Sequence, residues 1–305
     1  MSSNTLPALS VVVPVYNEQG NAGPLCGEIR EVMSAIGRPF EMIFVNDGST
    51  DATLAQLREI AATEPRLHVL DLDGNFGEAA ALSAGFQAAR GDLVITLDGD
   101  GQNDPHDIPR LLDTLERDGY RAVSGWRQAR QEDLVVRVLP SRIANRLIAA
   151  VSRVPLHDNG CGLKIYRRSV VEKAALPRGM NRFMPAIFGV TAEEVAEVPV
   201  RDRRRQHGQS HYGLSRTFVV LRDLLALRFI IAGARRAEPA WAVVAIAAAI
   251  GFLFGLSRSS GVLLGLFAAV EILALLIWRN LRRFNHAQQH GVFRIRREYS
   301  FAKDR

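Results

Sequence analysis

The stretch DLVITLDGDGQNDP, residues 92–105, joins an apolar run to a turn that holds three aspartates. Residues 93–97 are apolar or β-branched throughout, which predicts a strand buried on both faces of a sheet. Asp98, Asp100 and Asp104 follow directly. Open parallel sheets bind their ligands beyond the carboxyl ends of their strands. The stretch therefore predicts a parallel sheet with carboxylates at its ligand-binding edge.

Similar units precede this stretch. Short β-branched runs alternate with helical patterns, which predicts right-handed βαβ units and an α/β fold with a mostly parallel sheet. The expected strands are residues 10–15, 41–45, 67–70 and 93–97, and the expected helices are residues 21–36, 51–62 and 76–89. Polar segments follow the first, second and fourth strands, with the sequences YNE, NDGSTD and DGDGQND. Three polar segments at one edge of a sheet predict a single site.

The composition indicates a globular chain with an anionic partner. The 305 residues are 48% hydrophobic, enough for one substantial core and an appendage. Lysine and arginine total 38 against 32 acidic residues, which suits a nucleic acid, a phospholipid surface or a phosphorylated substrate. Nucleic acid is disfavoured because the arginines lack interleaved aromatic residues. Cys26 and Cys161 lie far apart and suit a reducing compartment, and the N-terminus lacks the pattern of a cleavable signal peptide.

Two apolar runs near the C-terminus predict a membrane hairpin. AWAVVAIAAAIGFLFGL (residues 240–256) and GVLLGLFAAVEILALLIW (residues 261–278) each approach the roughly 20 residues that cross a bilayer. The alternative, a buried hairpin of a soluble protein, is disfavoured because the runs lack a polar face. Arginines flank both outer ends, and Arg258 alone lies in the turn, so the positive-inside rule predicts a cytoplasmic large domain with both termini cytoplasmic. Residues 215–233 carry apolar residues at helical spacing among arginines, as in an interfacial helix.

These patterns divide the chain into four predicted segments. They are a nucleotide-binding α/β domain (1–214), an interfacial juxtamembrane helix (215–236), a transmembrane hairpin (237–280) and a basic cytoplasmic tail (281–305).

The acidic turn is the main candidate for chemistry. Oxygen ligands from Asp98, Asp100 and Gln102 can converge on a hard divalent cation, which would hold a diphosphate. The structural alternative is a solvated turn without a ligand. A pair of glycosidase carboxylates is the other chemical alternative, but it fits poorly, because two carboxylates on one turn do not readily flank a scissile bond. Tyr16 and Glu18 are candidates to stack on a base and to bind a ribose hydroxyl, and Asp47 to accept from a base or sugar, with helix capping as the structural alternative for Asp47.

Six motifs carry a resemblance to a known family. They are LSVVVPVYNE, FVNDGSTD, GNFGEAAALSAGF, LDGDGQNDP, DNGCGLKIYRR and HGQSHYGLSR, in this order. Over about residues 8–216 the chain resembles the family 2 glycosyltransferases with the GT-A (Rossmann-like) fold. More narrowly, it is similar to the polyprenyl-phosphate glycosyltransferases, the dolichol-phosphate mannose synthase group with its bacterial membrane-anchored relatives.

The resemblance implies roles for individual residues. Nucleotide contacts fall to Pro14, Tyr16, Glu18, Asp47, Asn75, Gly77 and Asp98, and metal binding to Asp98, Asp100 and Gln102. Acceptor phosphate binding falls to Arg127, Arg137, Ser141, Arg203, Arg205 and Ser210. The catalytic group comprises Asp158, Asp100 and Arg127, with Asp158 expected to orient the acceptor or Lys164 rather than act as a base.

The resemblance also implies a reaction and its setting. A sugar would pass with inversion from a UDP- or GDP-sugar to polyprenyl (undecaprenyl) phosphate, with Mg²⁺ or Mn²⁺, at the cytoplasmic face of a bacterial inner membrane. The product would serve cell-envelope glycan synthesis or lipid A modification, and a homo-oligomer, such as a tetramer, is expected. Two alternatives stay open: a processive polysaccharide synthase and a non-catalytic, membrane-tethered nucleotide-binding module.

Overall fold

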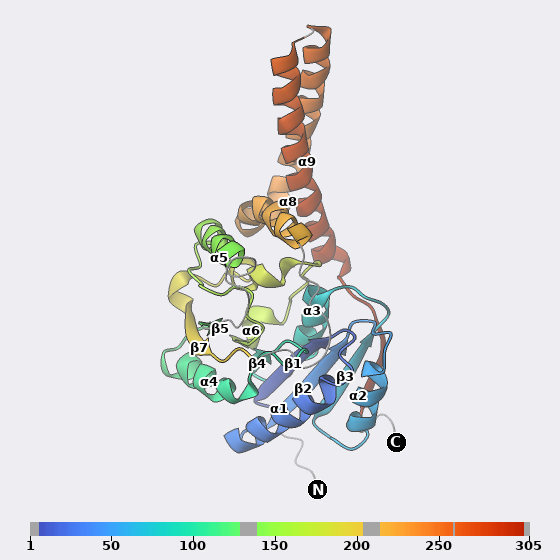
Figure 1. Ribbon diagram of the computed structural model, residues 1–305, viewed down its shortest axis with the longest axis vertical. Coiled ribbons are helices and arrows are strands. Elements are labelled where there is room, and N and C mark those ends of the chain that lie inside the picture. Colours follow the sequence, from blue (N-terminus) through green and yellow to red (C-terminus); the bar gives the residue numbers. More distant parts are fainter. Residues whose placement is uncertain (1–5, 129–138, 204–213, 259, 302–305) are drawn as a thin grey trace. The chain divides into compact units, whose positions relative to one another are not determined.

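The computed structural model describes residues 6–128, 139–203, 214–258 and 260–301. The chain divides into two compact units (Figure 1). The first comprises Met1–Tyr212 with Val292–Arg305, and the second is Gly213–Gly291.

The first unit is built on an eight-stranded sheet with the order β7-β5-β6-β4-β1-β2-β3-β8. β1 pairs in parallel with β2 and β4, β2 with β3, and β5 with β7, whereas β6 and β8 run antiparallel to their neighbours. The mostly parallel α/β sheet predicted from the sequence is therefore confirmed. The strands are β1 (Leu9–Val15), β2 (Phe40–Asn46), β3 (Leu67–Leu72), β4 (Leu93–Thr96), β5 (Ala122–Arg127), β6 (Lys164–Arg167), β7 (Val195–Val200) and β8 (Ile295–Ser300).

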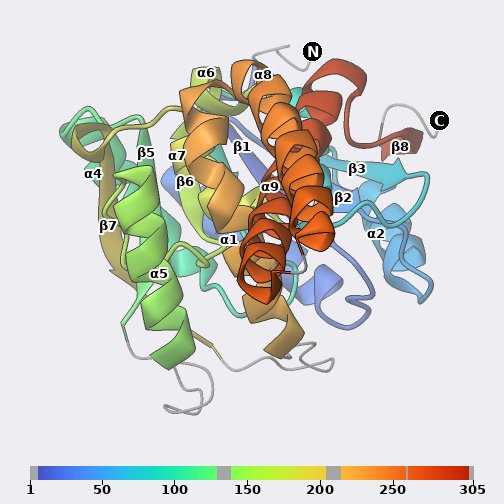
Figure 2. The ribbon, with the colours of Figure 1, turned by 90° about the horizontal axis from the view of Figure 1, so that it is seen from above.

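Helices connect these strands at the expected places. The three helices predicted between the first four strands agree with the structure to within two residues at each end. Figure 2 shows α4 and β7 at one edge of the sheet and α2 and β8 at the other. The helices of this unit are α1 (Ala22–Ile36), α2 (Thr53–Ala61), α3 (Glu78–Ala88), α4 (Ile108–Arg117), α5 (Leu139–Ser152), α6 (Arg168–Val171) and α7 (Met184–Ile187).

The core has two layers of side chains, one on each face of the sheet. Every residue of β1, β2 and β4 is buried. On one face Val11 and Val13 of β1 pack with side chains of α1, α2 and α4. On the other face lies α3, which is rich in alanine and buried along most of its length. Burial on both faces explains why these strands read as continuous apolar runs.

Strand β8 corrects the sequence-based interpretation of residues 281–305 as a basic tail. Residues 281–290 continue helix α9, and Ile295–Ser300 pairs antiparallel with β3. The strand was missed because it is an edge strand with four exposed residues in succession, three of them charged, so that its sequence IRREYS shows little apolar alternation. Tyr299 is its buried anchor, and Arg58 of α2 lies 4.7 Å above the tyrosine ring.

The second unit is a hairpin of α8 (Leu214–Ser257) and α9 (Gly261–His290), which pack side by side (Figure 1). Gly233 has non-helical angles (φ 122°, ψ 84°) and interrupts α8, and Pro239 follows within the helix. Arg222–Ser257 and Gly261–His290 are long and apolar enough to cross a membrane, and only 17% and 11% of their most apolar windows are buried. A core hairpin of a soluble protein would bury these windows, so the exposed apolar surface favours the predicted membrane hairpin.

A buried ion network ties the two helices of the hairpin together. The Asp223 carboxylate is buried and accepts hydrogen bonds from Arg222 (2.7 Å) on α8 and from Arg283 (3.2 Å) on α9. Asn280 donates from α9 to the carbonyl of Arg222 at 3.1 Å. If α8 and α9 packed in another register, a buried charge of this network would lose its partner. The network therefore favours the observed pairing of the two helices.

We predict that Tyr299→Ala destabilises the first unit by about 3 kcal/mol, because it removes the only large side chain by which β8 reaches the described core and leaves a cavity. In thermal unfolding of the detergent-solubilised chain this corresponds to a fall in Tm of roughly 6–12 °C. Ile295→Ala, on the same strand but 40% exposed, should change the Tm little. An equal Tm for wild type and Tyr299→Ala would show that β8 contributes nothing to stability.

Candidate active site

The acidic turn after β4 is held in shape by its own side chains. The backbone N–H of Asp98 donates to Asn103 Oδ1 at 3.1 Å, and that of Gln102 donates to Asp100 Oδ1 at 3.0 Å. Asn103 forms an isolated bridge with Asp202, and the Arg203 N–H donates to the Gln102 carbonyl at 2.9 Å. The turn is therefore fixed before any ligand arrives.

Asp98 lies among other carboxylates. Burial, and then the negative charges of Glu78 and Asp100, raise the pKa of Asp98 to about 8, while Arg127 and Lys164 oppose the shift. Its carboxyl group packs against Gly162, where a Cβ atom would lie only 2.2 Å from Asp98 Cγ. No residue other than glycine therefore fits at position 162 while Asp98 stays in place.

Arg127 and Asp158 form a buried, bidentate ion pair. Arg127 Nε donates to Asp158 Oδ2 at 2.8 Å and Nη2 to Oδ1 at 3.2 Å. Burial disfavours the charged guanidinium, but the hydrogen bonds and the charge of Asp158 outweigh it, so the pKa of Arg127 is raised. The Asp158 N–H donates to Glu197 Oε1 of β7 at 3.1 Å. Both carboxylate oxygens of Asp158 are thus committed to Arg127, which suits an orienting group better than a base.

Lys164 completes the positive side of the site from the start of β6. It is buried, and its Nζ donates to the carbonyl of Asn159 at 3.3 Å and to that of Cys161. These two bonds fix the shape of the loop between Asp158 and Lys164.

Asp47 shapes the neighbouring loop, residues 74–77. Its carboxylate accepts from the N–H groups of Phe76 (2.7 Å) and Gly77 (2.8 Å), and burial raises its pKa while these hydrogen bonds lower it in part. From the other side Arg178 donates to the carbonyls of Asn75 (2.8 Å) and Phe76 (3.3 Å). Asp47 thus positions Gly77 and Arg178 positions Asn75, the two residues of this loop that are expected to line the nucleotide site.

The residues after β1 lie at the same edge of the sheet. Pro14 is in β1. A Cβ atom added at Gly99 would lie only 2.7 Å from the Pro14 carbonyl oxygen, so the acidic turn passes directly over this strand end. Tyr16 is 44% exposed, as a ring that stacks on a base would be. Glu18 accepts from Asn21 Nδ2 at 2.7 Å, and its N–H donates to Thr53 Oγ1 at 2.9 Å.

Arg203 does not face the site as a free cation. Its guanidinium donates to Glu28 of α1 and to Asp104, both at 2.6 Å. Ser141 lies in α5. The expected acceptor residues Arg137, Arg205 and Ser210 lie outside the residues that the structure describes.

Sequence reasoning missed two residues with clear roles at the site. Glu78, in the first turn of α3, contributes to the charge around Asp98 but reads from sequence as an ordinary acidic residue at a helix start. Arg178 lies about 100 residues beyond the loop it holds and belongs to none of the motifs. A glycine was visible at position 162, but its contact with Asp98 was not.

The carboxylate cluster fits a divalent cation. The negative charges of Glu78 and Asp100 disfavour ionisation of Asp98, and a cation between carboxylates relieves such repulsion. Within the described ranges no group of three or more histidine, cysteine, aspartate or glutamate side chains is arranged as a complete metal site. A cation here would therefore need oxygen ligands from a substrate or water, as Mg²⁺ bound by one or two carboxylates and phosphates does. The contacts of Gln102 given above come from its backbone, so its predicted role as a ligand stays a prediction.

Comparison with known proteins assigns the family. The model of glycosyl transferase family 2 matches residues 10–174, more than half of the chain, and the chain belongs to this family. It is 45% identical over 224 residues to dodecaprenyl-phosphate galacturonate synthase from Rhizobium johnstonii, covering 72% of this chain and 66% of that protein. It is 38% identical over 223 residues to undecaprenyl-phosphate 4-deoxy-4-formamido-L-arabinose transferase from Edwardsiella ictaluri, covering 72% and 68%. The match thus spans about two thirds of each relative.

Solved structures show the fold of the first unit. Glucosyl-3-phosphoglycerate synthase from Mycobacterium tuberculosis, in complex with Mn²⁺, UDP and phosphoglyceric acid, aligns with a TM-score of 0.58 at 20% identity, covering 74% of this chain and 79% of the other. Mannosyl-3-phosphoglycerate synthase from Rubrobacter xylanophilus gives 0.54 at 20% identity, covering 73% and 74%. The predicted glycosyltransferase fold is confirmed.

We predict that Gly162→Ala reduces metal-dependent nucleotide binding about 100-fold, because the new methyl group displaces the Asp98 carboxyl by at least 1 Å. Gly160→Ala is the matched control, since its nearest neighbours would lie 3.6 and 3.7 Å from the added carbon. Calorimetric titration of both variants with UDP or GDP and Mn²⁺ measures the effect, and thermal unfolding verifies that both fold. Equal affinity for the two variants would contradict the assignment of Asp98.

Proposed function

We propose that the protein transfers a sugar from a nucleotide diphosphate sugar to a polyprenyl phosphate at a membrane surface. The observation that carries the proposal is the set of charges that act on Asp98: the negative charges of Glu78 and Asp100, and the positive charges of Arg127 and Lys164. Such a site suits two anionic substrates, one brought by a cation and one bound by arginine. The names of the relatives, which are transferases of dodecaprenyl and undecaprenyl phosphate, support the same acceptor class.

On the donor side, Asp98 and Asp100 would hold Mg²⁺ or Mn²⁺, whose charge when bound offsets that of the diphosphate leaving group. The loop 74–77, fixed by Asp47 and Arg178, would line the nucleotide pocket, and exposed Tyr16 would stack on the base. The base and the sugar are selected by groups that contact them directly, so a panel of UDP- and GDP-sugars is the appropriate probe.

On the acceptor side, the lipid phosphate is itself the nucleophile. The second pKa of a phosphate monoester is about 6, so near neutral pH the acceptor is a dianion and needs no general base. Its oxygen would attack the anomeric carbon as the nucleotide diphosphate leaves, which inverts the configuration. Arg127, fixed by Asp158, would bind this phosphate with its planar guanidinium.

The setting follows from the hairpin. Arginines 228, 235 and 236 precede the apolar segments, arginines 279, 282 and 283 follow them, and Arg258 stands alone between them. By the positive-inside rule both flanks of the hairpin face the cytoplasm of a bacterial inner membrane, with two spans. The first unit would then act at the cytoplasmic face, supplying a lipid-linked sugar to the cell envelope. Self-association through the hairpin, as a tetramer for example, is part of this proposal.

A purified full-length chain with polyprenyl phosphate, Mn²⁺ or Mg²⁺ and a panel of sugar nucleotides should form a glycolipid bearing one sugar. EDTA or Asp98→Ala should reduce the rate at least about 1,000-fold, since the leaving group loses its main electrostatic stabilisation. Product mass separates the alternatives: chains of several sugars would indicate a polysaccharide synthase, and nucleotide binding without product from any donor would indicate a non-catalytic module.

We expect the rate to rise with pH through about pH 6 and then to level off, because the acceptor becomes dianionic over this range. Asp158→Asn should lower kcat about 100-fold by misplacing Arg127 but leave the midpoint of this profile unchanged. The pH dependence of kcat/KM for polyprenyl phosphate, at saturating donor and Mn²⁺, is compared for wild type and variant. Loss of the pH dependence in Asp158→Asn would instead identify Asp158 as a general base.

A further inference from the structure

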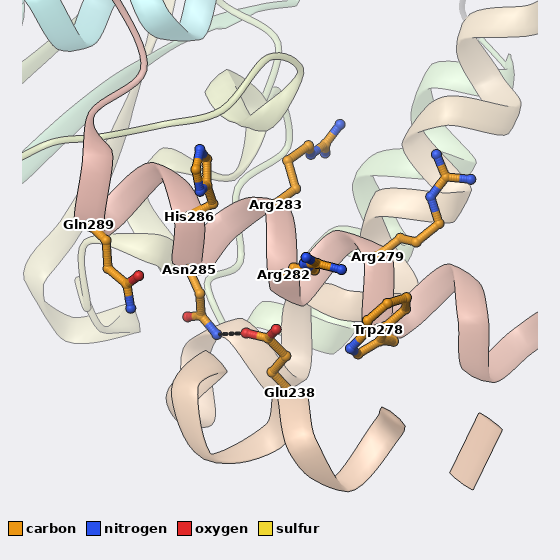
Figure 3. Close-up of a pocket in the computed structure, with 8 residues that line it drawn as sticks. All are labelled: Glu238, Trp278, Arg279, Arg282, Arg283, Asn285, His286 and Gln289. Atoms are coloured by element: carbon orange, nitrogen blue, oxygen red, sulfur yellow. Dashed lines mark hydrogen bonds between the residues drawn. The ribbon is translucent and has the colours of Figure 1, made fainter. Parts of the chain in front are cut away.

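A groove of about 620 Å³ runs along the end of α9 in the second unit (Figure 3). Its lining combines basic, amide and aromatic side chains with one carboxylate. The lining residues are Glu238 of α8 and Trp278, Arg279, Arg282, Arg283, Asn285, His286 and Gln289 of α9.

The groove carries an excess of positive charge. Asn285 Nδ2 donates to the Glu238 carboxylate at 2.7 Å, and Arg283 is bound to Asp223 at 3.2 Å. Within the described part of the chain, neither Arg279 nor Arg282 forms an ion pair with a carboxylate. Both are exposed, and the Arg282 guanidinium lies 5.3 Å from the centre of the Trp278 ring.

Arg279 and Arg282 are close enough along the helix for their long side chains to reach one shared anion. Residues three apart on a helix have neighbouring side chains, with Cβ atoms about 5–6 Å apart. Guanidinium groups bind phosphate oxygens with paired N–H donors, so a phosphate is the anion this pair fits best.

The place of the groove along the hairpin selects the source of that phosphate. Trp278 is the last residue of the apolar run 261–278, and tryptophan at the end of a membrane span marks the depth of the lipid headgroups. Arg279 and Arg282 follow within about 6 Å along the helix axis. Basic pockets between membrane helices at this depth hold anionic lipid headgroups.

We propose that this groove binds the phosphate group of an anionic phospholipid, with Arg279 and Arg282 as its ligands and Trp278 against the upper acyl chain. The proposal rests on the membrane placement of the hairpin under the proposed function, but not on turnover. The bound lipid would fix the groove side of α9 at the membrane surface.

The test counts lipids bound to the full-length chain. Protein in a nonionic detergent is titrated with phosphatidylglycerol or phosphatidylcholine, and complexes are quantified by native mass spectrometry. Wild type should retain one phosphatidylglycerol in preference to phosphatidylcholine. Arg279→Gln with Arg282→Gln should weaken phosphatidylglycerol binding about 30-fold, and Arg282→Gln alone about 5-fold.

The matched control is Arg235→Gln with Arg236→Gln, which removes the same charge from exposed positions of α8 that do not line the groove. The affinity of this variant for phosphatidylglycerol should stay within about threefold of the wild-type value, because charge lost outside the groove acts on the lipid only through a screened field. Thermal unfolding in phosphatidylcholine verifies the fold of each variant, and nucleotide binding with Mn²⁺ should be unchanged in all of them.

Three outcomes would overturn the proposal. An equal loss of phosphatidylglycerol affinity in the groove variant and in the control would mean that the lipid binds a diffuse basic surface. Displacement of the lipid by millimolar inorganic phosphate would mean a site for a soluble anion. Displacement by equimolar polyprenyl phosphate would mean that the groove belongs to the acceptor and not to a resident phospholipid.

Discussion

The first unit depends on one electrostatic conflict, the crowding of Asp98 by Asp100 and Glu78 at the end of β4. Asp98 does not ionise readily there without compensation, because burial and the two neighbouring negative charges raise its pKa. Part of the compensation is internal, from Arg127 and Lys164. Under the proposed function, a bound cation and the diphosphate that it carries would supply the rest of the compensation.

The surrounding strands make this arrangement rigid. β1, β4 and β6 bring Pro14, Asp98 and Lys164 to one edge of the sheet, and β5 and β7 bring Arg127 and Glu197. Asp158 links the second group, since it binds Arg127 through its carboxylate and Glu197 through its backbone N–H. A guanidinium held in this way is oriented without a ligand, and under the proposed function such preorganised charge would stabilise a transition state without a cost of reorganisation.

Much of this could be predicted from the sequence, because the signals were local. The strands of the parallel sheet are continuous β-branched runs, and the acidic turn follows one of them directly. What could not be predicted depends on distant contacts. β8 is an edge strand with one buried side chain, Tyr299, so its sequence resembles a charged tail. The contacts of Arg203 with Glu28 and Asp104 join residues far apart in the sequence, and its expected contact with a phosphate stays a prediction.

Under the proposed function the acidic turn carries a divalent cation together with the nucleotide diphosphate. Crystals of the full-length chain grown with Mn²⁺ and UDP or GDP test it directly through the anomalous scattering of manganese. The account predicts a manganese peak bonded to a carboxylate oxygen of Asp98 or Asp100 and to oxygens of both phosphates. A diphosphate bound elsewhere, or manganese absent from this turn while nucleotide is present, would contradict it.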